Sequence, residues 1–299
     1  MMKSRSIGDI VFDSAIIFIA VISLIIVGYP LIFIISSSFS STEAVVSGKV
    51  WLLPVDFSLE GYKAIFTYSQ IWTGYWNSIV YTVLSTCYGL LLTICAAYPL
   101  YRKSFKPRNV IMAFFTFTMF FEGGIIPTYL LLRNMNMLDT IWVIAIPWSL
   151  SVMNIILMRT YFTTTIPNSL LEASQLDGCS DIKFLTLVVL PLSKPIIAVL
   201  VLFMAVGMWN GYFASLIYLS SESKFPLQLV LRNILVLNQF DANKVGSFIG
   251  NEKLMLERIN LQHLMKYSLI IVSILPILVI YPFVQKHLVK GIMIGAVKG

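Results

Sequence analysis

The sequence predicts an all-helical (all-α) membrane protein that crosses the lipid bilayer six times. Of its 299 residues, 58% are hydrophobic and only 12% are charged, which is about half the charged fraction of a soluble domain. The mean hydropathy is +0.85. Six apolar runs each contain about 20 residues, the length at which a helix crosses about 30 Å of hydrocarbon. We expect residues 1–299 to form a single transmembrane domain.

The predicted spans are set by where the apolar runs begin and end. They cover residues 14–35, 77–100, 110–132, 140–158, 196–219 and 264–284. Pro147 interrupts the fourth run, and a Gly-Gly-x-x-Pro sequence interrupts the third near its middle. A polar segment, residues 159–195, separates the fourth span from the fifth.

The first run could also be the apolar core of a cleaved signal peptide. Such a core is 7–15 residues long and precedes a small-residue cleavage site, whereas this run covers residues 14–35. We therefore expect an uncleaved first span. The three cysteines have neither disulfide nor metal-site spacing; we interpret Cys87 and Cys95 as packing residues and expect no metal site.

The distribution of Lys and Arg predicts the orientation. With the N-terminus inside, the inner segments hold 12 of the 21 cations and the longer outer segments hold 8. Four of the inner cations, Arg102, Lys103, Lys106 and Arg108, lie within one turn. Cytoplasmic segments carry the excess of Lys and Arg, so we expect both termini and the polar segment in the cytoplasm.

Local signals divide the polar segment into two short helices. Pro167 suits the first turn of a helix, where its missing N–H has no partner in any case. Gly178 can supply the left-handed residue that ends a helix. Ser180 or Asp181 can cap a second helix, because their side-chain oxygens accept hydrogen bonds from free N–H groups.

This pattern also fits an amphipathic hairpin that only anchors the bundle at the membrane surface. Two features disfavour that alternative. The segment carries three cations and three anions, which makes it a poor binder of lipid headgroups. Its small residues Ala173, Ser174 and Gly178 would let the surface of a partner approach closely.

The polar segment resembles the EAA loop of permease subunits of ATP-binding-cassette importers. It reads Glu172-Ala173-Ser174-x3-Gly178-x9-Val188-x-Leu190-Pro191, with Ser174 and Val188 where the family has Ala and Ile. Further stretches resemble the carbohydrate branch related to maltose permeases and, within it, the complex-oligosaccharide subgroup. They are residues 166–172, 190–195, 207–210, 123–129 and 289–295.

The resemblance implies a type I importer permease fold and a mechanical role. The first loop helix would seat in a groove on a nucleotide-binding subunit, with Glu172 as an ionic contact and Gly178 shaping the turn. The further contact residues that it implies are Ala173, Ser174, Asp177, Leu190 and Pro191. Closure of two ATP-binding subunits would pull the loops together.

The implied partners are a homologous second permease, two copies of an ATP-binding subunit and an extracytoplasmic solute-binding protein. The cargo would be a carbohydrate, and the location the cytoplasmic (inner) membrane of a prokaryote. The outer segment 220–262 would include a loop that touches the binding protein. No nucleic acid is expected as a partner.

Nothing in the sequence indicates an enzyme or a bound cofactor. It has no G-x4-G-K-[ST] phosphate loop and no His-Glu-x-x-His metal motif. No nucleophile–base constellation appears either. ATP and Mg²⁺ would bind to the partner subunits, and the energy must come from another polypeptide.

Polar residues inside the spans suggest a substrate path. Glu122 lies near the middle of the third span, where a charge is costly unless it faces a cavity or a partner. Asn154, Trp209, Asn210 and Tyr212 combine amides with aromatic faces, as sugar sites do. The alternatives are a Glu122 bonded within the bundle or nearer its outer surface, and asparagines that join helices with space-filling or interfacial aromatics.

Other functions compete with this interpretation. An ion-gradient-driven carrier could use Glu122 as its coupling acid, but it has no need of an EAA pattern. A membrane-embedded enzyme lacks a catalytic cluster. An importer permease for a non-carbohydrate solute would share the same loop.

Overall fold

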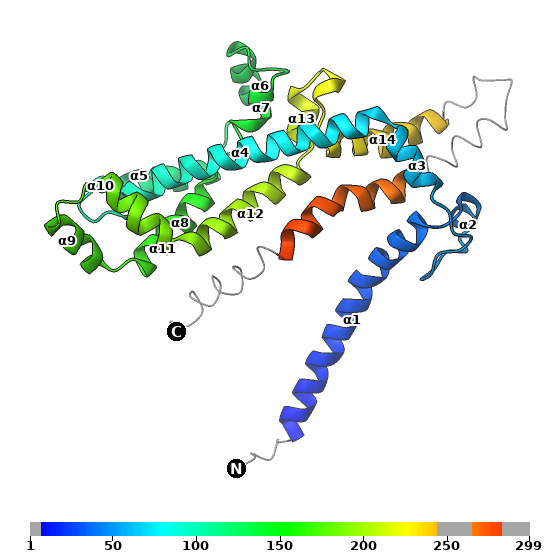
Figure 1. Cartoon of the computed structure of the whole chain (residues 1–299), viewed down its shortest axis with the longest axis horizontal. Coiled ribbons are helices and arrows are strands. Elements are labelled where there is room, and N and C mark those ends of the chain that lie inside the picture. The colour runs from blue at the N-terminus through cyan, green and yellow to red at the C-terminus, as the bar shows by residue number, and fades with distance from the viewer. Residues whose placement is uncertain (1–6, 244–264, 283–299) are drawn as a thin grey trace. The chain divides into compact units, whose positions relative to one another are not determined.

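Long and broken helices make up the described part of the chain, residues 7–243 and 265–282 of the computed structural model. No strand occurs in these residues. The chain divides into two compact units. The first comprises Met1–Ser69 with Asn233–Leu275, and the second Gln70–Arg232 with Pro276–Gly299. Figure 1 shows the helices of both units, coloured along the chain.

The first unit is built around the end of a long apolar helix, α1 (Ile7–Ser38). The short helices α2 (Thr42–Val46) and α3 (Glu60–Thr67) follow it. The Ser36 hydroxyl donates to the Leu52 carbonyl at 2.7 Å, and Ser268 donates to the Ser38 carbonyl at 3.4 Å. None of the most apolar window of α1 is buried among the described residues, so the unit holds α1 by its C-terminal end.

The second unit is organised around α4 (Ser69–Tyr101), an unbroken helix of 33 residues. Pro99 lies in its last turn, where it does not interrupt the helix. The end of α4 shares a hydrophobic core with α8 (Val152–Thr165) and α12 (Lys194–Asn210). The fully buried members of this core include Ala97, Ile155, Met158, Phe162 and Leu200.

Three of the predicted spans are broken helices. The third consists of α5 (Arg108–Phe120) and α6 (Ile125–Asn134), which meet at 110°. Gly124 precedes α6 with φ +83°, a conformation that glycine adopts without steric cost. The fifth consists of α12 and α13 (Phe213–Tyr218), with Gly211 between them.

The fourth predicted span differs most from a single helix. It begins as α7 (Ile141–Ala145) and resumes only at Val152, the start of α8. Pro147 has no backbone N–H to continue the helical hydrogen bonds, which accounts for a break at this place. The helix α8 then continues to Thr165, so it extends beyond the predicted end at residue 158.

The number of membrane crossings therefore stays a prediction. Three helices are long and apolar enough to cross alone, namely Gly8–Ser38, Ser69–Tyr101 and Met265–Pro282. Counting each of two bent pairs as one span gives up to five among the described residues. One of these pairs joins Asp181–Leu192 to Lys194–Asn210 at 79°, so it includes part of the polar segment.

Beyond α13 the chain forms a 3₁₀ turn, Glu222–Lys224, and then α14 (Leu227–Asn243). The rest of the predicted outer segment, residues 244–262, lies outside the described residues.

Candidate functional site

The polar segment folds as the predicted pair of short helical pieces. The first is α9 (Asn168–Leu176). The second consists of α10 (Asp181–Phe184), a π-helical turn (Leu185–Val189) and α11 (Leu190–Leu192). Pro167 directly precedes α9 instead of lying in its first turn. The Ser180 side chain caps α10 by accepting from the Lys183 N–H at 3.4 Å.

The turn at Gly178 is a Schellman motif. Gly178 has φ +67°. Its N–H donates to the Gln175 carbonyl at 3.1 Å, and the Cys179 N–H donates to the Ser174 carbonyl at 2.9 Å. These two hydrogen bonds define a Schellman motif, and the motif requires left-handed backbone at the position of Gly178. Glycine is therefore needed here for its backbone.

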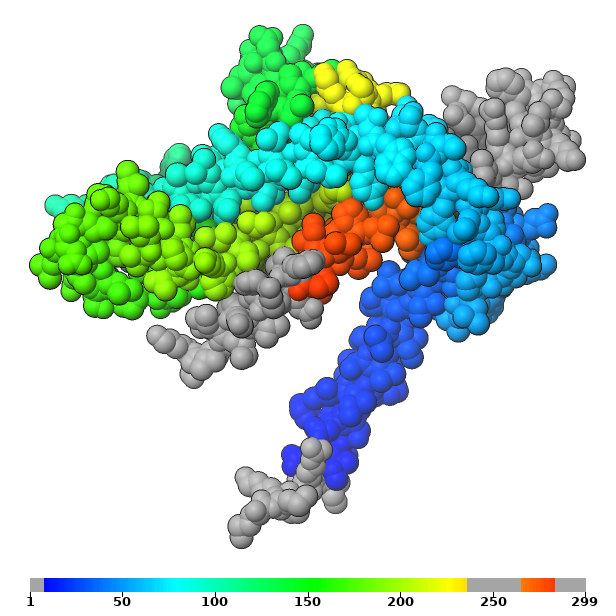
Figure 2. Space-filling model, in the orientation of Figure 1, coloured from blue at the N-terminus to red at the C-terminus, as the bar shows by residue number. Residues whose placement is uncertain are grey.

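The two pieces differ sharply in burial. No residue of α9 is buried; Glu172 and Ala173 are exposed, as are Asp177 and Gly178 in the turn that follows. In the second piece, Phe184 and Val189 are only 1% and 0% exposed, within the core shared with α4, α8 and α12. The face shown in Figure 2 leaves the green α9 surface uncovered by the described chain. One piece is thus available to a partner, while the other is anchored.

The other predicted contact residues are less open or lie apart from α9. Ser174 is partly buried, and its hydroxyl donates to the Leu171 carbonyl of its own helix at 2.7 Å. Leu190 is partly buried, and Pro191 is exposed in the first turn of α11. Leu190 and Pro191 belong to α11, whereas Glu172 belongs to α9.

An ion pair fastens the second piece to the end of α4. Arg102, which directly follows α4, has a side chain that is 9% exposed and lies 2.9 Å from the Asp181 carboxylate. Its other terminal nitrogen donates to the Tyr98 hydroxyl at 3.0 Å. That hydroxyl donates to the Asp181 backbone carbonyl at 3.2 Å. Arg102 and Tyr98 together therefore hold the first residue of α10.

The N-terminal half of α4 is fastened to the segment between α13 and α14. The Asn77 side-chain amide donates to the Ser223 and Phe225 carbonyls at 2.8 and 3.0 Å. The Tyr81 hydroxyl donates to the Lys224 carbonyl at 2.7 Å. Ser78 accepts a hydrogen bond from the Leu227 N–H at 2.8 Å.

Asp139 also holds the segment between α13 and α14. Its carboxylate accepts from the Ser220 and Ser221 N–H groups at 3.0 Å, from the Ser221 hydroxyl at 2.6 Å and from Lys224 at 2.9 Å. Hydrogen bonds from Ser221 and then from Lys224 lower the pKa of Asp139 well below its usual value. The carboxylate therefore stays charged and keeps its partners at neutral pH.

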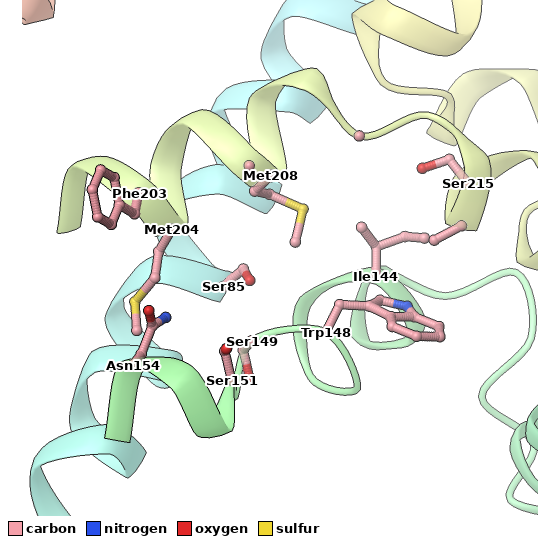
Figure 3. Close-up of a pocket in the computed structure, with 13 residues that line it drawn as sticks. Ser85, Ile144, Trp148, Ser149, Ser151, Asn154, Phe203, Met204, Met208 and Ser215 are labelled. Atoms are coloured by element: carbon pink, nitrogen blue, oxygen red, sulfur yellow. The ribbon is translucent and has the colours of Figure 1, made fainter. Parts of the chain in front are cut away.

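A cavity of about 320 Å³ lies where the breaks in the fourth and fifth predicted spans meet α4. Five of its lining side chains are polar and neutral: Ser85, Ser149, Ser151, Asn154 and Ser215. In Figure 3, Asn154 on α8 and Met204 on α12 lie toward one another, with Trp148 across the opening. No charged side chain is among the residues that line it, so it suits a neutral, hydroxyl-bearing group.

Of the predicted path residues, Asn154 is the one that lines this cavity. Trp209 is 6% exposed and packs edge-on against Tyr75 at 5.8 Å between ring centroids. Asn210 and Tyr212 are exposed on either side of Gly211, which itself lines the cavity. Glu122 is exposed in the break between α5 and α6. The structure thus does not gather the five residues into one site.

Several of these site features escaped the sequence analysis. Arg102 appeared there only as one of four cations that set the orientation, and Asp181 only as a possible cap. A cation at the end of a span and an acid at the start of a later helix give no spacing signal, because the contact joins residues far apart in the chain. Within the described residues, no group of three or more His, Cys, Asp or Glu could hold a metal ion.

Comparison with known proteins gives concordant results. The family model described as "Binding-protein-dependent transport system inner membrane component" matches residues 89–294. The chain is 37% identical to Protein LplC of Bacillus subtilis (strain 168), over 90% of this chain and 89% of that protein. It is 36% identical to the polygalacturonan/rhamnogalacturonan transport system permease protein YtcP of the same organism, over 100% of both.

A solved structure gives the same result at the level of the fold. It is the crystal structure of a bacterial ABC transporter involved in the import of the acidic polysaccharide alginate. One of its chains matches with a TM-score of 0.85 and 34% identity, covering 95% of this chain and 99% of that one.

Proposed function

Because the chain belongs to the family of binding-protein-dependent transport system inner membrane components, we propose that it serves an importer of oligosaccharides. The importer is driven by ATP that is hydrolysed on a separate subunit. The chain is a permease of an ATP-binding-cassette importer, and its family consists of transport permeases. The observation that supports the cargo class best is the full-length similarity to a permease named for polygalacturonan and rhamnogalacturonan transport.

Oligomers of acidic sugars are the first cargo to test. Two relatives above 30% identity have names that give a cargo, one polygalacturonan and rhamnogalacturonan and the other the acidic polysaccharide alginate. More distant relatives, at 24–26% identity, are named for arabinooligosaccharides and for melibiose, raffinose and stachyose. Neutral oligosaccharides are therefore the second class.

The cavity beside Asn154 is the proposed contact with the cargo. Its serine hydroxyls and the Asn154 amide can exchange hydrogen bonds with sugar hydroxyls, and Trp148 offers an aromatic face. Its lining has no cation to pair with a uronate carboxylate. We infer that this chain recognises ring hydroxyls and that carboxylates of an acidic cargo are met elsewhere in the importer.

We further propose that α9 is the seat for the ATP-binding subunit. It is the exposed piece of the polar segment, and it presents Glu172 and Ala173 with no residue of the helix buried. Asp177 and Gly178 form the turn that joins it to the anchored piece. A movement imposed on α9 would therefore be passed through a short, hydrogen-bonded turn to helices α4, α8 and α12.

The remaining elements of this proposal concern assembly and orientation. Six spans with cytoplasmic termini would place the polar segment beside the ATP-binding subunits in a prokaryotic inner membrane. One chain would pair with a homologous permease, receive its cargo from a solute-binding protein and leave ATP and Mg²⁺ to its partners. The exposed apolar stretch of α1 gives such a pairing an apolar surface to use.

Uptake into proteoliposomes tests the energy source. The chain would be reconstituted with its permease partner, ATP-binding subunit and binding protein, and uptake of oligogalacturonates, alginate oligomers and raffinose measured by mass spectrometry. We expect uptake only with ATP on the side of the ATP-binding subunit. Uptake driven by a proton or sodium gradient without ATP would overturn the proposal in favour of a secondary carrier.

A charge reversal tests whether α9 contacts the ATP-binding subunit. Glu172→Lys changes an exposed side chain of α9, and Lys106→Glu reverses an exposed charge outside the polar segment as the matched control. We expect Glu172→Lys to reduce uptake at least tenfold, with both variants present in the membrane at equal amounts. Full uptake by Glu172→Lys would refute the role of α9.

A further inference from the structure

The helix α4 is fastened in its N-terminal half and at its C-terminal end to segments that belong to different sides of the proposed importer. At its C-terminal end, Arg102 and Tyr98 hold Asp181 of the polar segment. In its N-terminal half, Asn77 and Tyr81 hold the segment Glu222–Lys224 and the residue after it. Figure 1 shows α4 as one continuous ribbon between these two places in the second unit.

The length of α4 fits a mechanical connection across the membrane. It is unbroken from Asn77 to its last residue, Tyr101, and a rise of 1.5 Å per residue over this stretch gives about 36 Å. That length exceeds the hydrocarbon thickness of about 30 Å. In the described part of this unit, a glycine or proline break separates α5 from α6, α7 from α8 and α12 from α13, so α4 is the stiffest path there.

We propose that α4 carries the signal between the outer segment that meets the binding protein and the polar segment that meets the ATP-binding subunit. This rests on the proposed function, because it needs a partner at each end. Arg102 and Asn77 act as positioning residues in this connection. Each transmits movement between α4 and a segment that touches a partner.

The inner fastening depends on the shape of a guanidinium group. Arg102 uses one terminal nitrogen for the Tyr98 hydroxyl and the other for the Asp181 carboxylate. A lysine has one charged nitrogen and cannot reproduce this planar fork. The Asp181 side chain is 69% exposed, so replacing it removes the ion pair without leaving a buried cavity.

The outer fastening depends on the two donor hydrogens of an amide. Asn77 satisfies the carbonyls of Ser223 and Phe225 with a single side-chain nitrogen. Gly74, one turn before Asn77, lets Leu227 approach closely, because an added Cβ would lie 3.1 Å from the Leu227 Cα. The outer segment is thus held against α4 by hydrogen bonds and by close packing.

A double-mutant cycle tests the connection. The variants Asn77→Ala, Asp181→Asn and the double variant would be assembled with the partner subunits, and ATP hydrolysis measured with and without loaded binding protein. The quantity of interest is the stimulation factor. Residues this far apart normally have additive effects, so a serial connection makes a distinctive prediction. Each single variant should lower the stimulation about fivefold or more, and the double variant no further.

Controls separate this inference from simple destabilisation and from the proposed function. The decreases in melting temperature caused by the two single variants should add in the double variant. Their effects on the stimulation factor should not add. Asp181→Glu should restore most of the stimulation, and Lys103→Gln, at the exposed cation beside Arg102, should leave it unchanged. Stimulation losses that multiply in the double variant would overturn the role of α4. The proposed function fails on a different result, uptake driven by a proton or sodium gradient without ATP.

Discussion

Substitution of Gly178 separates a backbone requirement from a need for space. Gly178 lies in the left-handed region with φ +67°, and a Cβ added to it would meet no atom within 4 Å. Alanine is therefore opposed only by its backbone, at about 1–2 kcal/mol. Asparagine tolerates this conformation better, and valine much worse because it is β-branched.

These costs act on the turn that joins α9 to the anchored piece. Because 1.4 kcal/mol corresponds to a tenfold change in an equilibrium constant, alanine should lower the ratio of the native turn to its other conformations by about fivefold to thirtyfold relative to glycine. We expect uptake to follow the order Gly, Asn, Ala, Val at position 178, with Asn close to the wild-type protein. Proteoliposome uptake at matched protein levels is the assay.

The reversed order would refute this reasoning. If Gly178→Ala transported as well as or better than Gly178→Asn, the size of the side chain would matter more than its backbone preference. The turn would then be limited by the surface of a partner, because the chain itself leaves the space open. Equal uptake by Gly178→Val would show that the Schellman geometry is not needed at all.

Three further perturbations follow from the described contacts. Gly89→Ala should destabilise the protein by at least about 1–3 kcal/mol, because the added Cβ would lie 2.2 Å from the Ser149 carbonyl oxygen. Gly207→Ala is the control, because a Cβ there would meet no atom within 4 Å. Its melting temperature in detergent should equal or exceed that of the wild-type protein. Asp139→Asn should lower the melting temperature at pH 7; since the pKa of Asp139 is lowered in the folded chain, this difference should begin to fade only below about pH 4. Asn154→Ala, in the cavity lining, should raise the KM for cargo while leaving ATP hydrolysis without cargo unchanged.

Each of these has a contrary outcome. Equal melting temperatures for the two glycine variants would mean that α4 does not approach the break before α8 as closely as described. A difference between Asp139→Asn and the wild-type protein that persists undiminished at strongly acidic pH would remove the charge from the explanation. An unchanged KM for Asn154→Ala would place the cargo elsewhere.

The sequence predicted the class of fold because hydrophobic burial in a bilayer leaves long apolar runs that can be read directly. It also predicted the turn at Gly178, since left-handed backbone strongly favours glycine. It was less informative about helices broken inside apolar runs. Pro147 marked a break, but the Gly211 break between α12 and α13 was not anticipated.

Contacts between distant residues were beyond reach of the sequence. Trp209, a predicted residue of the substrate path, is buried and packs edge-on against Tyr75, a contact that no spacing in the sequence indicates. The pair of Arg102 and Asp181 joins two segments whose separation along the chain carries no periodic signal. Only the packing of α4 against the polar segment brings those charges together, and that packing depends on the whole unit.

Cross-linking from α9 tests the central claim most directly. A photoreactive amino acid would replace Gln175, an exposed residue of α9, and Arg133, an exposed residue in the last turn of α6 and on the predicted outer side, in separate variants of the assembled importer. The account predicts a covalent adduct with the ATP-binding subunit from position 175 and none from position 133. An assembled, active importer that gives no adduct from position 175, or equal adducts from both, would contradict it.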